Sequence, residues 1–341
     1  MANKQDFSID TIKLAQYLMQ HIDGFEGPVS EEKFAGGQSN PTYLLTAKSG
    51  NYVLRRKPLG NLLKSAHAVD REYRVISALA NTQVPVAKVY HLCEDNSVIG
   101  SMFYVMEFID GRVFWDPKLP ELSKAQRKNV YSEMNRIMAA LHSVDLEATG
   151  LSDFGRPGNY FQRQIERWTQ QYRAAETEVI NDMELLIAWL PENLPEDDGK
   201  LTLVHGDFRL DNMMFSKDTE RVLALADWEL STLGHPYADL AYQCMQLRMR
   251  SDSMLSGLGD VNRAALGIPS EQAYVAEYCN RMGIAEIPNW NFYLAFSFFR
   301  LAAILQGVKK RSLAGNSSNK NAAQMGEEIR PLLKLAAQII S

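Results

Sequence analysis

The spacing of apolar residues changes along the chain and divides it into a strand-rich part and a helical part. Apolar residues between Ile12 and Met19 recur three or four positions apart, which predicts a first helix with Ser8 as its cap. β-Branched and aromatic residues then predict short strands, broken by one helix near residues 66–80. The predicted strands lie at 33–35, 42–47, 52–55, 89–93 and 103–108.

After about residue 112 the helical spacing dominates. Two short apolar strands interrupt it, and a loop is predicted at 191–199, beginning at Pro191. The pattern as a whole predicts an α+β fold of two lobes, a small sheet-rich lobe over 1–109 and a larger, mostly helical lobe over 110–341. The predicted helices of the second lobe lie near 124–142, 160–173, 182–190 and from 238 onward, and its strands lie at 202–204 and 222–226.

The composition is that of a globular protein that does not bind nucleic acid. Of the 341 residues 46% are hydrophobic, and 36 Lys and Arg against 41 Asp and Glu give a net charge of −5, whereas nucleic-acid binders usually carry a basic excess. The three cysteines lie far apart, which argues against a disulfide scaffold and fits a cytoplasmic location. We expect no signal peptide, and we expect a buried helix with no membrane partner at 292–305, because that apolar stretch is short and contains Arg300.

The two strands predicted in the second lobe each run into a carboxylate. One leads into His205, Gly206 and Asp207 and on to Asn212, and the other leads into Asp227. The aspartates and Asn212 offer hard oxygen atoms of the kind that Mg²⁺ prefers. The spacing D-x-x-x-x-N after a histidine is the layout of a kinase catalytic loop, in which the Asp accepts the hydroxyl proton and the Asn holds magnesium. The sequence therefore predicts Asp207 as the catalytic residue and Asn212 and Asp227 as Mg²⁺ ligands.

A glycine-rich segment, residues 36–41, joins two predicted strands of the first lobe. Such a loop can present backbone N–H groups to phosphates, and Ser39 adds a hydroxyl. Gly37, Ser39 and Asn40 are therefore candidate ATP contacts, with an ordinary hairpin turn as the alternative.

These motifs resemble the aminoglycoside phosphotransferase family of small-molecule kinases, most of all the kinase-like domains fused to some acyl-CoA dehydrogenases and their stand-alone bacterial relatives. The resemblance covers nearly the whole chain, and its most specific part is H-G-D…N followed by D-W-E. The family shares the protein-kinase-like fold, so the resemblance implies that fold, with ATP and Mg²⁺ as cofactors. The other matching segments are 37–43, 53–58, 65–67, 71–74 and 103–107.

The resemblance also implies roles for residues of the first lobe. Arg55 takes the place of the kinase lysine that holds the α- and β-phosphates, and Glu72 takes the place of its helix partner. Arginine departs from the usual lysine, and for residues 55–57 surface charges on an edge strand stay the alternative. Glu107, Phe108 and Ile109 match the segment between the lobes that contacts adenine through its backbone.

In the second lobe, the resemblance places Arg209 where many kinases hold a cation beside the γ-phosphate. A structural ion pair is the alternative for this residue. His205 is expected to support the catalytic loop by hydrogen bonds rather than to bind metal.

The acceptor is predicted from charge and from the resemblance. Lys and Arg outnumber Asp and Glu by 11 to 8 from residue 231 onward, which disfavours a polycationic aminoglycoside. Arg163 and Arg167 lie one turn apart on a predicted helix and suit an anion such as a CoA phosphate, with a solvated face as the alternative. The related domains phosphorylate the 4-hydroxyl of 4-hydroxyacyl-CoAs, so the resemblance implies an acyl-CoA substrate.

The sequence thus predicts an ATP- and Mg²⁺-dependent phosphotransferase that moves the γ-phosphate to a hydroxyl of a small molecule, with a 4-hydroxyacyl-CoA as the first candidate. A kinase for an amino sugar, a choline-like compound or another small alcohol is the second. A nucleotide-binding pseudokinase and a metal-dependent phosphohydrolase that uses the same acids are the rivals from other classes. Protein substrates are disfavoured, because no activation loop ending in A-P-E follows Asp227. The oligomeric state is left open.

Overall fold

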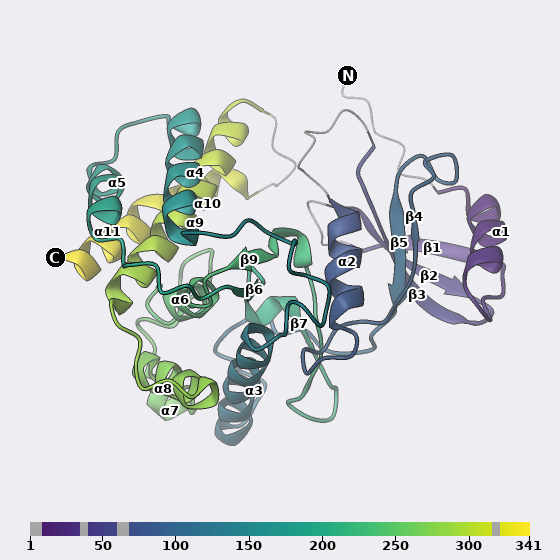
Figure 1. Cartoon of the computed structure of the whole chain (residues 1–341), viewed down its shortest axis with the longest axis horizontal. Helices are drawn as coiled ribbons and strands as arrows, with labels where there is room; N and C mark the ends of the chain where they lie inside the picture. Colours follow the sequence, from purple (N-terminus) through teal and green to yellow (C-terminus); the bar gives the residue numbers. More distant parts are fainter. Residues whose placement is uncertain (1–8, 35–39, 60–67, 316–320) are drawn as a thin grey trace. The chain divides into compact units, whose positions relative to one another are not determined.

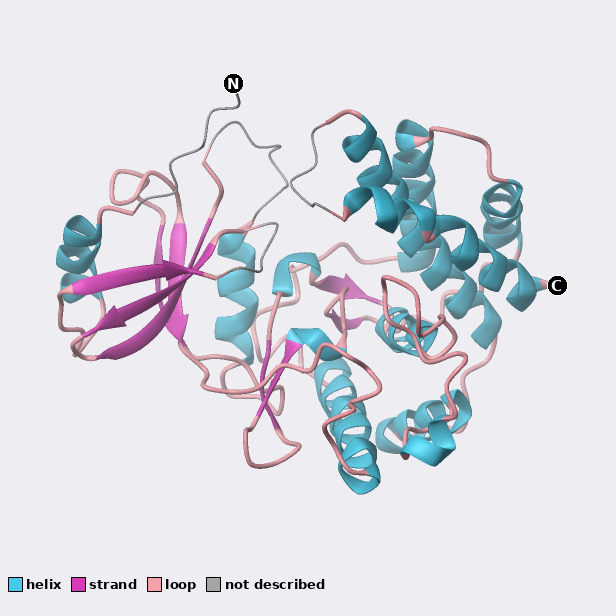
Figure 2. Cartoon of the chain, turned by 180° about the vertical axis from the view of Figure 1, so that it is seen from behind, coloured by secondary structure: helices cyan, strands magenta, loops and turns pink. Residues whose placement is uncertain are grey.

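The structure is a computed structural model that describes residues 9–34, 40–59, 68–315 and 321–341. It divides into two compact units, drawn in Figures 1 and 2, namely Met1–Arg112 with Leu223–Glu229, and Val113–Val222 with Leu230–Ser341. The sequence pattern predicted the boundary at 109/110 and all later residues in the larger lobe. The segment Leu223–Glu229 belongs to the first unit instead, because the backbone N–H of Leu225 donates to the Pro85 carbonyl at 2.8 Å and Asp227 pairs with Arg55.

Several expectations fall on residues outside the described ranges. They are the helix cap Ser8, the end of the strand predicted at 33–35, the candidate phosphate contacts Gly37 and Ser39, and the start of the helix predicted at 66–80.

The first unit is built on a five-stranded antiparallel sheet in the order β1-β2-β3-β5-β4. The second and fourth strands have the predicted bounds, the third and fifth differ by one or two residues, and the first begins earlier than predicted. The strands are β1 (Val29–Lys33), β2 (Thr42–Ala47), β3 (Gly50–Arg56), β4 (Val89–Cys93) and β5 (Phe103–Glu107).

Two helices lie on opposite sides of this sheet (Figures 1 and 2). α1 (Thr11–His21) is capped by Asp10, whose side chain accepts from the Lys13 backbone N–H at 3.0 Å, so the cap is Asp10 rather than the expected Ser8. α2 (Val69–Leu79) carries Glu72 on its buried face. Successive side chains of a strand point to opposite faces, so Leu54 joins the apolar core with α1 while Arg55 reaches Glu72 of α2.

The second unit is mostly helical and carries short strands that flank the segment from His205 to Asn212. β6 (Thr202–Val204) pairs with β9 (Thr232–Gly234) in antiparallel register. β7 (Met213–Phe215) follows the segment that carries Asp207 and Asn212, and β8 (Val222–Leu225) comes next, with only Val222 in this unit. The helices are α3 (Lys124–His142), α4 (Tyr160–Ala175), α5 (Asn181–Glu192), α6 (Tyr237–Gln246), α7 (Arg263–Leu266), α8 (Glu271–Met282), α9 (Trp290–Leu313), α10 (Ala322–Glu327) and α11 (Ile329–Ile340).

The long helix α9 forms the centre of this unit, and α4, α6, α10 and α11 pack against it. It is apolar and long enough to cross a membrane, yet 78% of its most apolar window is buried inside the protein, as expected for a core helix.

One expectation for a neighbouring helix is wrong. Pro191 does not begin a loop but lies in the last turn of α5, where the fixed φ of proline fits a helix and its missing N–H costs one bond.

Candidate active site

In the first unit, Arg55 of β3 is paired with two carboxylates. Its Nε lies 2.7 Å from Glu72 Oε2, and its Nη2 lies 2.8 Å from Asp227 Oδ1. Its side chain is 11% exposed, and β3 lies between β2 and β5, so Arg55 is not a surface charge on an edge strand. Burial disfavours the guanidinium charge, but Glu72, Tyr104 and Asp227 together hold the pKa of Arg55 above its ordinary value.

The neighbouring Arg56 points to the other face of the sheet, as strand alternation requires. Its guanidinium donates to Ser101 Oγ at 2.9 Å and to the Ile99 carbonyl at 2.7 Å. It is 1% exposed, so Arg56 is a structural residue and only Arg55 is placed beside Glu72 and Asp227.

Glu72 is locked in position by two further buried side chains. Asn40 Nδ2 donates to Glu72 Oε1 at 2.7 Å, and Tyr104 OH donates to Glu72 Oε2 at 3.2 Å. Asn40 is one of the predicted ATP contacts; its side chain is fully buried, and a contact to phosphate through its backbone N–H stays a prediction. Its side chain therefore fixes the Arg55–Glu72 pair instead of facing solvent.

Asp227 sits in a backbone conformation that an L-residue adopts at a cost. Its φ is +63°, in the left-handed region, where Asp is tolerated better than most residues. Trp228, buried behind it, donates its indole N–H to the Leu225 carbonyl at 2.9 Å and holds the turn. Strain of about 1–3 kcal/mol that is kept by surrounding contacts is typical of functional sites. The turn leaves the Asp227 side chain 37% exposed while Oδ1 bonds to Arg55.

The segment expected to contact adenine, Glu107 to Ile109, begins at the last residue of β5. The Glu107 backbone N–H donates to the Lys88 carbonyl at 2.8 Å, and the Ile109 carbonyl accepts from the Gly111 N–H at 3.0 Å. Glu107, Phe108 and Ile109 are all half-buried. Their role in adenine binding stays a prediction.

In the second unit, the loop between β6 and β7 is held in place by the buried carboxylate of Asp239. Asp239 of α6 accepts the backbone N–H groups of His205 at 2.6 Å and of Gly206 at 2.9 Å. Burial disfavours the Asp239 charge, but the His142 imidazole 3.5 Å away and the hydrogen bond from His205 hold its pKa below the ordinary value. His142 in turn bonds through Nδ1 to Tyr278 OH at 2.7 Å.

Gly206 is required in this loop. Its φ is +83°, and a Cβ at this position would lie 2.6 Å from the Leu230 carbonyl oxygen. Arg300 of α9 donates to the Gly206 carbonyl at 2.5 Å. These contacts fix the position of the loop. They therefore also fix the position of the carboxylate of Asp207, which follows Gly206.

Both oxygens of the Asp207 carboxylate accept hydrogen bonds. Tyr242 OH of α6 donates to Oδ1 at 2.9 Å, and Asn212 Nδ2 donates to Oδ2 at 3.1 Å and to the Asp207 backbone carbonyl at 2.8 Å. The Asp207 N–H donates to His205 Nδ1 at 3.3 Å, which is the supporting contact expected of His205. Burial and the Asp207 charge raise the pKa of Tyr242, so its hydroxyl keeps its proton and remains a donor.

Arg209 forms a two-pronged ion pair with Asp211, with Nε–Oδ1 at 3.0 Å and Nη2–Oδ2 at 2.8 Å. Burial opposes its charge, but Tyr242, Asp211 and Asp207 hold its pKa above the ordinary value. This pair is the alternative that the sequence left open for Arg209. A role beside the γ-phosphate stays a prediction.

The residues expected to hold Mg²⁺ fit a hard cation in chemistry. The Asn212 amide points its nitrogen at Asp207, so its oxygen is the atom left to bind a ligand. Asp227 uses only Oδ1 for Arg55 in the contacts described. Proteins commonly supply only a few oxygen ligands to Mg²⁺, and phosphates and water supply the others. An amide oxygen and a carboxylate oxygen are ligands of this kind.

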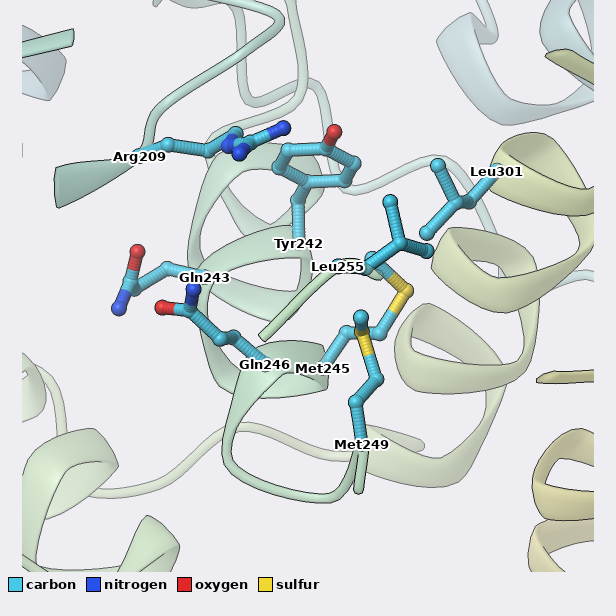
Figure 3. A pocket seen from close by; sticks show the side chains of 8 residues that line it. All are labelled: Arg209, Tyr242, Gln243, Met245, Gln246, Met249, Leu255 and Leu301. Carbon is cyan, nitrogen blue, oxygen red and sulfur yellow. The ribbon is translucent and has the colours of Figure 1, made fainter. Parts of the chain in front are cut away.

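A small cavity of about 30 Å³ opens beside Tyr242 in the second unit (Figure 3). Arg209 and Tyr242 contribute to its wall, so it lies one side chain away from the Asp207 carboxylate. The rest of the lining comes mainly from α6 and the residues after it, and includes the apolar side chains of Met249, Leu255 and Leu301.

Two residues of this site were not found by sequence reasoning. Asp239 carried a usable signal, because it is the acidic residue in the run Ala238-Asp239-Leu240-Ala241, and a carboxylate in an apolar helix must find buried partners. Tyr242 carried none, because an aromatic residue on a helix is most often a core residue. Of the anion-binding face expected at Arg163 and Arg167, Arg163 donates to the carbonyls of Arg156 and Pro157, and anion binding at this face stays a prediction.

Comparison with known proteins shows the family. Residues 30–274 match the profile of the Phosphotransferase enzyme family. Acyl-CoA dehydrogenase family member 10 of Mus musculus is 51% identical over 311 residues, which are 91% of this chain and 29% of that protein. A crystal structure from Ralstonia eutropha JMP134, of a protein provisionally named an aminoglycoside phosphotransferase, is 50% identical with a TM-score of 0.90, over 97% of this chain and 98% of that one.

A more distant structure agrees in fold alone. The aminoglycoside phosphotransferase APH(4)-Ia, in a ternary complex with ADP and hygromycin B, is 13% identical with a TM-score of 0.63, over 96% of this chain and 98% of that one. The chain therefore belongs to the phosphotransferase enzyme family, and it spans less than a third of the length of its mouse relative. These findings confirm the expected resemblance, the α+β kinase-like fold and the enzyme class, a phosphotransferase.

Proposed function

We propose that this protein transfers the γ-phosphate of ATP to a hydroxyl of a small molecule, with a 4-hydroxyacyl-CoA as the first candidate. The observation that carries the proposal is the Asp207 carboxylate, held by Tyr242 and Asn212 at the end of a loop that Asp239 anchors. A carboxylate fixed in this way can orient an attacking hydroxyl and accept its proton.

The step breaks the bond between the γ-phosphorus and the oxygen that bridges it to the β-phosphate, and it forms a bond from that phosphorus to the acceptor oxygen. The acceptor proton passes to Asp207, and ADP leaves with the bridging oxygen. Asn212 and Asp227 are the residues that would hold Mg²⁺, which when bound would supply neutralisation of phosphate charge. Arg55, whose charge is maintained by Glu72, would face the α- and β-phosphates, for which its planar guanidinium is suited.

The acceptor class is supported by the walls of the cavity and by the relatives. The described lining of the cavity contains no Asp or Glu and is largely apolar, which disfavours a polycationic amino sugar and suits an alcohol with a hydrocarbon part. Relatives of the chain are named as acyl-CoA dehydrogenases, and the chain matches under half of their length. An acyl-CoA that carries a hydroxyl is therefore the first candidate.

The test is mass spectrometry of a mixed pool of alcohols after incubation with enzyme, ATP and Mg²⁺. The pool contains 4-hydroxyacyl-CoAs, free hydroxy acids, amino sugars and choline. We expect a phosphorylated 4-hydroxyacyl-CoA with the wild-type chain, and Asp207→Ala to lower its formation by about 10²–10⁴-fold while ATP binding is kept. Asp218→Ala, an exposed aspartate in the turn after β7, is the control and keeps full turnover.

A pseudokinase is the second candidate, because Arg55 stands where kinases use lysine. It is favoured if the wild-type chain binds ATP in the presence of Mg²⁺ but phosphorylates no alcohol of the pool. Wild-type turnover in Asp207→Ala would remove the assigned role of Asp207.

A further inference from the structure

Arg300 is a buried cation in the middle of the apolar helix α9. The two residues on each side of it are buried and apolar, and Arg300 itself is only 7% exposed. It forms no ion pair with an aspartate or glutamate among the residues that the structure describes. A buried charge without a carboxylate partner is costly in a folded protein, so other contacts hold this guanidinium in place.

Two aromatic rings and one carbonyl supply these contacts. The guanidinium carbon of Arg300 lies over the Tyr242 ring of α6, 5.3 Å from its centre, and over the Trp168 ring of α4, 5.7 Å from its centre. At both distances the negative face of an aromatic ring attracts a cation. Nη2 also donates to the Gly206 carbonyl at 2.5 Å. Arg300 therefore joins α4 and α6 to the loop that carries Asp207.

The Tyr242 ring connects Arg300 to the Asp207 carboxylate. The Tyr242 hydroxyl donates to Asp207 Oδ1 at 2.9 Å, so the position of the ring determines where this oxygen is held. Burial and the Asp207 charge raise the pKa of Tyr242, whereas the charges of Arg209 and Arg300 act in the opposite direction. A nearby cation favours the phenolate form and so makes the hydroxyl a stronger hydrogen-bond donor. Arg300 thus acts on one hydroxyl in two ways, by fixing the ring and by its charge.

We infer that Arg300 is a positioning residue for the phosphoryl transfer and that it acts on Asp207 through the Tyr242 ring, an inference that rests on the proposed function because it concerns the residue assigned to accept the acceptor proton. An apolar side chain at this position would also pack inside α9, but it would place no cation over the ring and donate no hydrogen bond to the loop. The contacts of Arg300 with described residues include none of the predicted ATP contacts. Loss of Arg300 should therefore lower kcat and leave the KM for ATP unchanged.

The experiment measures kcat and the KM for ATP with a 4-hydroxyacyl-CoA as acceptor, at a temperature at which circular dichroism shows every variant to be folded. Arg300→Met keeps the length of the side chain but removes its charge, and we expect kcat to fall by about 100-fold, as for a misplaced catalytic group. Arg300→Lys keeps a cation near the ring and should lose only about tenfold. Arg311→Met, an exposed arginine in the last turn of the same helix, is the matched control and keeps both constants.

A double-mutant cycle with Tyr242→Phe separates this role from a general structural one. Tyr242→Phe keeps the ring but removes the hydrogen bond to Asp207, which should lower kcat by about 10- to 100-fold. If Arg300 acts through this hydroxyl, the loss in the double variant is clearly smaller than the product of the two single losses. A loss equal to that product, as for independent sites, would show that Arg300 acts elsewhere and would overturn the inference.

Failure of the proposed function gives a different result. If the wild-type chain phosphorylates no alcohol, the proposed function fails, and the positioning is then measured by hydrogen exchange of the backbone amides in residues 203–212. Arg300→Met and Tyr242→Phe should each speed up this exchange, with less than the multiplied effect in the double variant, and Arg311→Met should not change it. Wild-type exchange in Arg300→Met overturns the inference. Arg300→Lys replaces Arg300→Met in both cycles if the latter does not fold.

Discussion

Replacing Asp239 by asparagine is expected to damage both the stability and the activity of the protein. The side chain of Asp239 is 1% exposed and accepts two backbone N–H groups, those of His205 and Gly206. Asparagine has the same shape but keeps only one acceptor oxygen. The new NH₂ group would face one of these two backbone N–H groups. That N–H would lose its acceptor, and two hydrogen-bond donors would lie against each other.

The magnitude follows from these two losses. One hydrogen bond to a charged acceptor contributes about 1.5–3 kcal/mol, and a buried donor left without a partner costs about 1–3 kcal/mol. We therefore expect Asp239→Asn to lower the free energy of unfolding by roughly 3–5 kcal/mol, as expected for breaking a buried charged contact. Since the same bonds fix the loop that carries Asp207, kcat should fall by about 100-fold, which is typical of a misplaced catalytic group.

The pH dependence gives this prediction a second readout. The pKa of Asp239 is depressed in the folded protein, so its contribution is fully present above the unfolded value of about 3.9 and is lost as the pH falls through the folded value. The stability difference between wild type and Asp239→Asn should thus be constant from about pH 8 to pH 5 and shrink below about pH 4.

Urea unfolding monitored by circular dichroism measures this difference, with Asp252→Asn as the control. Asp252 forms an exposed pair with Arg250, and such pairs contribute about 0–1 kcal/mol. An unfolding midpoint and a kcat of Asp239→Asn equal to those of the wild type would refute the anchoring role of Asp239.

Two further predictions concern Arg55 and His235. Arg55→Lys should raise the KM for ATP by about tenfold in a steady-state assay, because one ammonium group cannot bridge Glu72 and Asp227 as the guanidinium does. The control is Arg56→Lys, on the opposite face of β3, which should lower stability but leave this KM unchanged. Burial lowers the pKa of His235 to about 4 despite Asp198 nearby, so stability that is complete above pH 6.5 should be lost as the pH falls towards 4. The loss of stability is at most about 3 kcal/mol. The melting temperature measured from pH 7 to pH 4 should depend less on pH for His235→Gln than for the wild type. An equal pH dependence of the two proteins would contradict the lowered pKa of His235.

Local patterns were sufficient for most of the secondary structure. The strands 42–47, 89–93 and 202–204 and the helix 124–142 have the bounds that their spacing predicts, because alternation and helical periodicity report which face is buried. The bounds were wrong at β1 and at the end of α5, where Pro191 fits the last helical turn. Boundaries depend on caps and on tertiary contacts that spacing does not reveal.

In the candidate site, too, some features were predictable from the sequence and others were not. The motif spacing identified Asp207, Asn212 and Asp227, and the family resemblance identified Arg55 and Glu72, whose ion pair the structure contains. Asn40 was singled out for its place in a glycine-rich segment, yet its side chain holds Glu72. A sequence shows that a polar residue is present, but the direction of its side chain depends on what packs around it.

What the sequence determined by itself is the chemistry that the chain can offer, because carboxylates, an amide and an arginine at kinase spacing are fixed by their order along the chain. The tertiary structure alone decided which side chains complete the site. Asp239 and Tyr242 lie on α6, at least 32 residues after Asp207, and no local pattern connects them to it. Contacts between distant segments are selected by packing and by the need to pair every buried polar group, and those requirements act only in the folded chain.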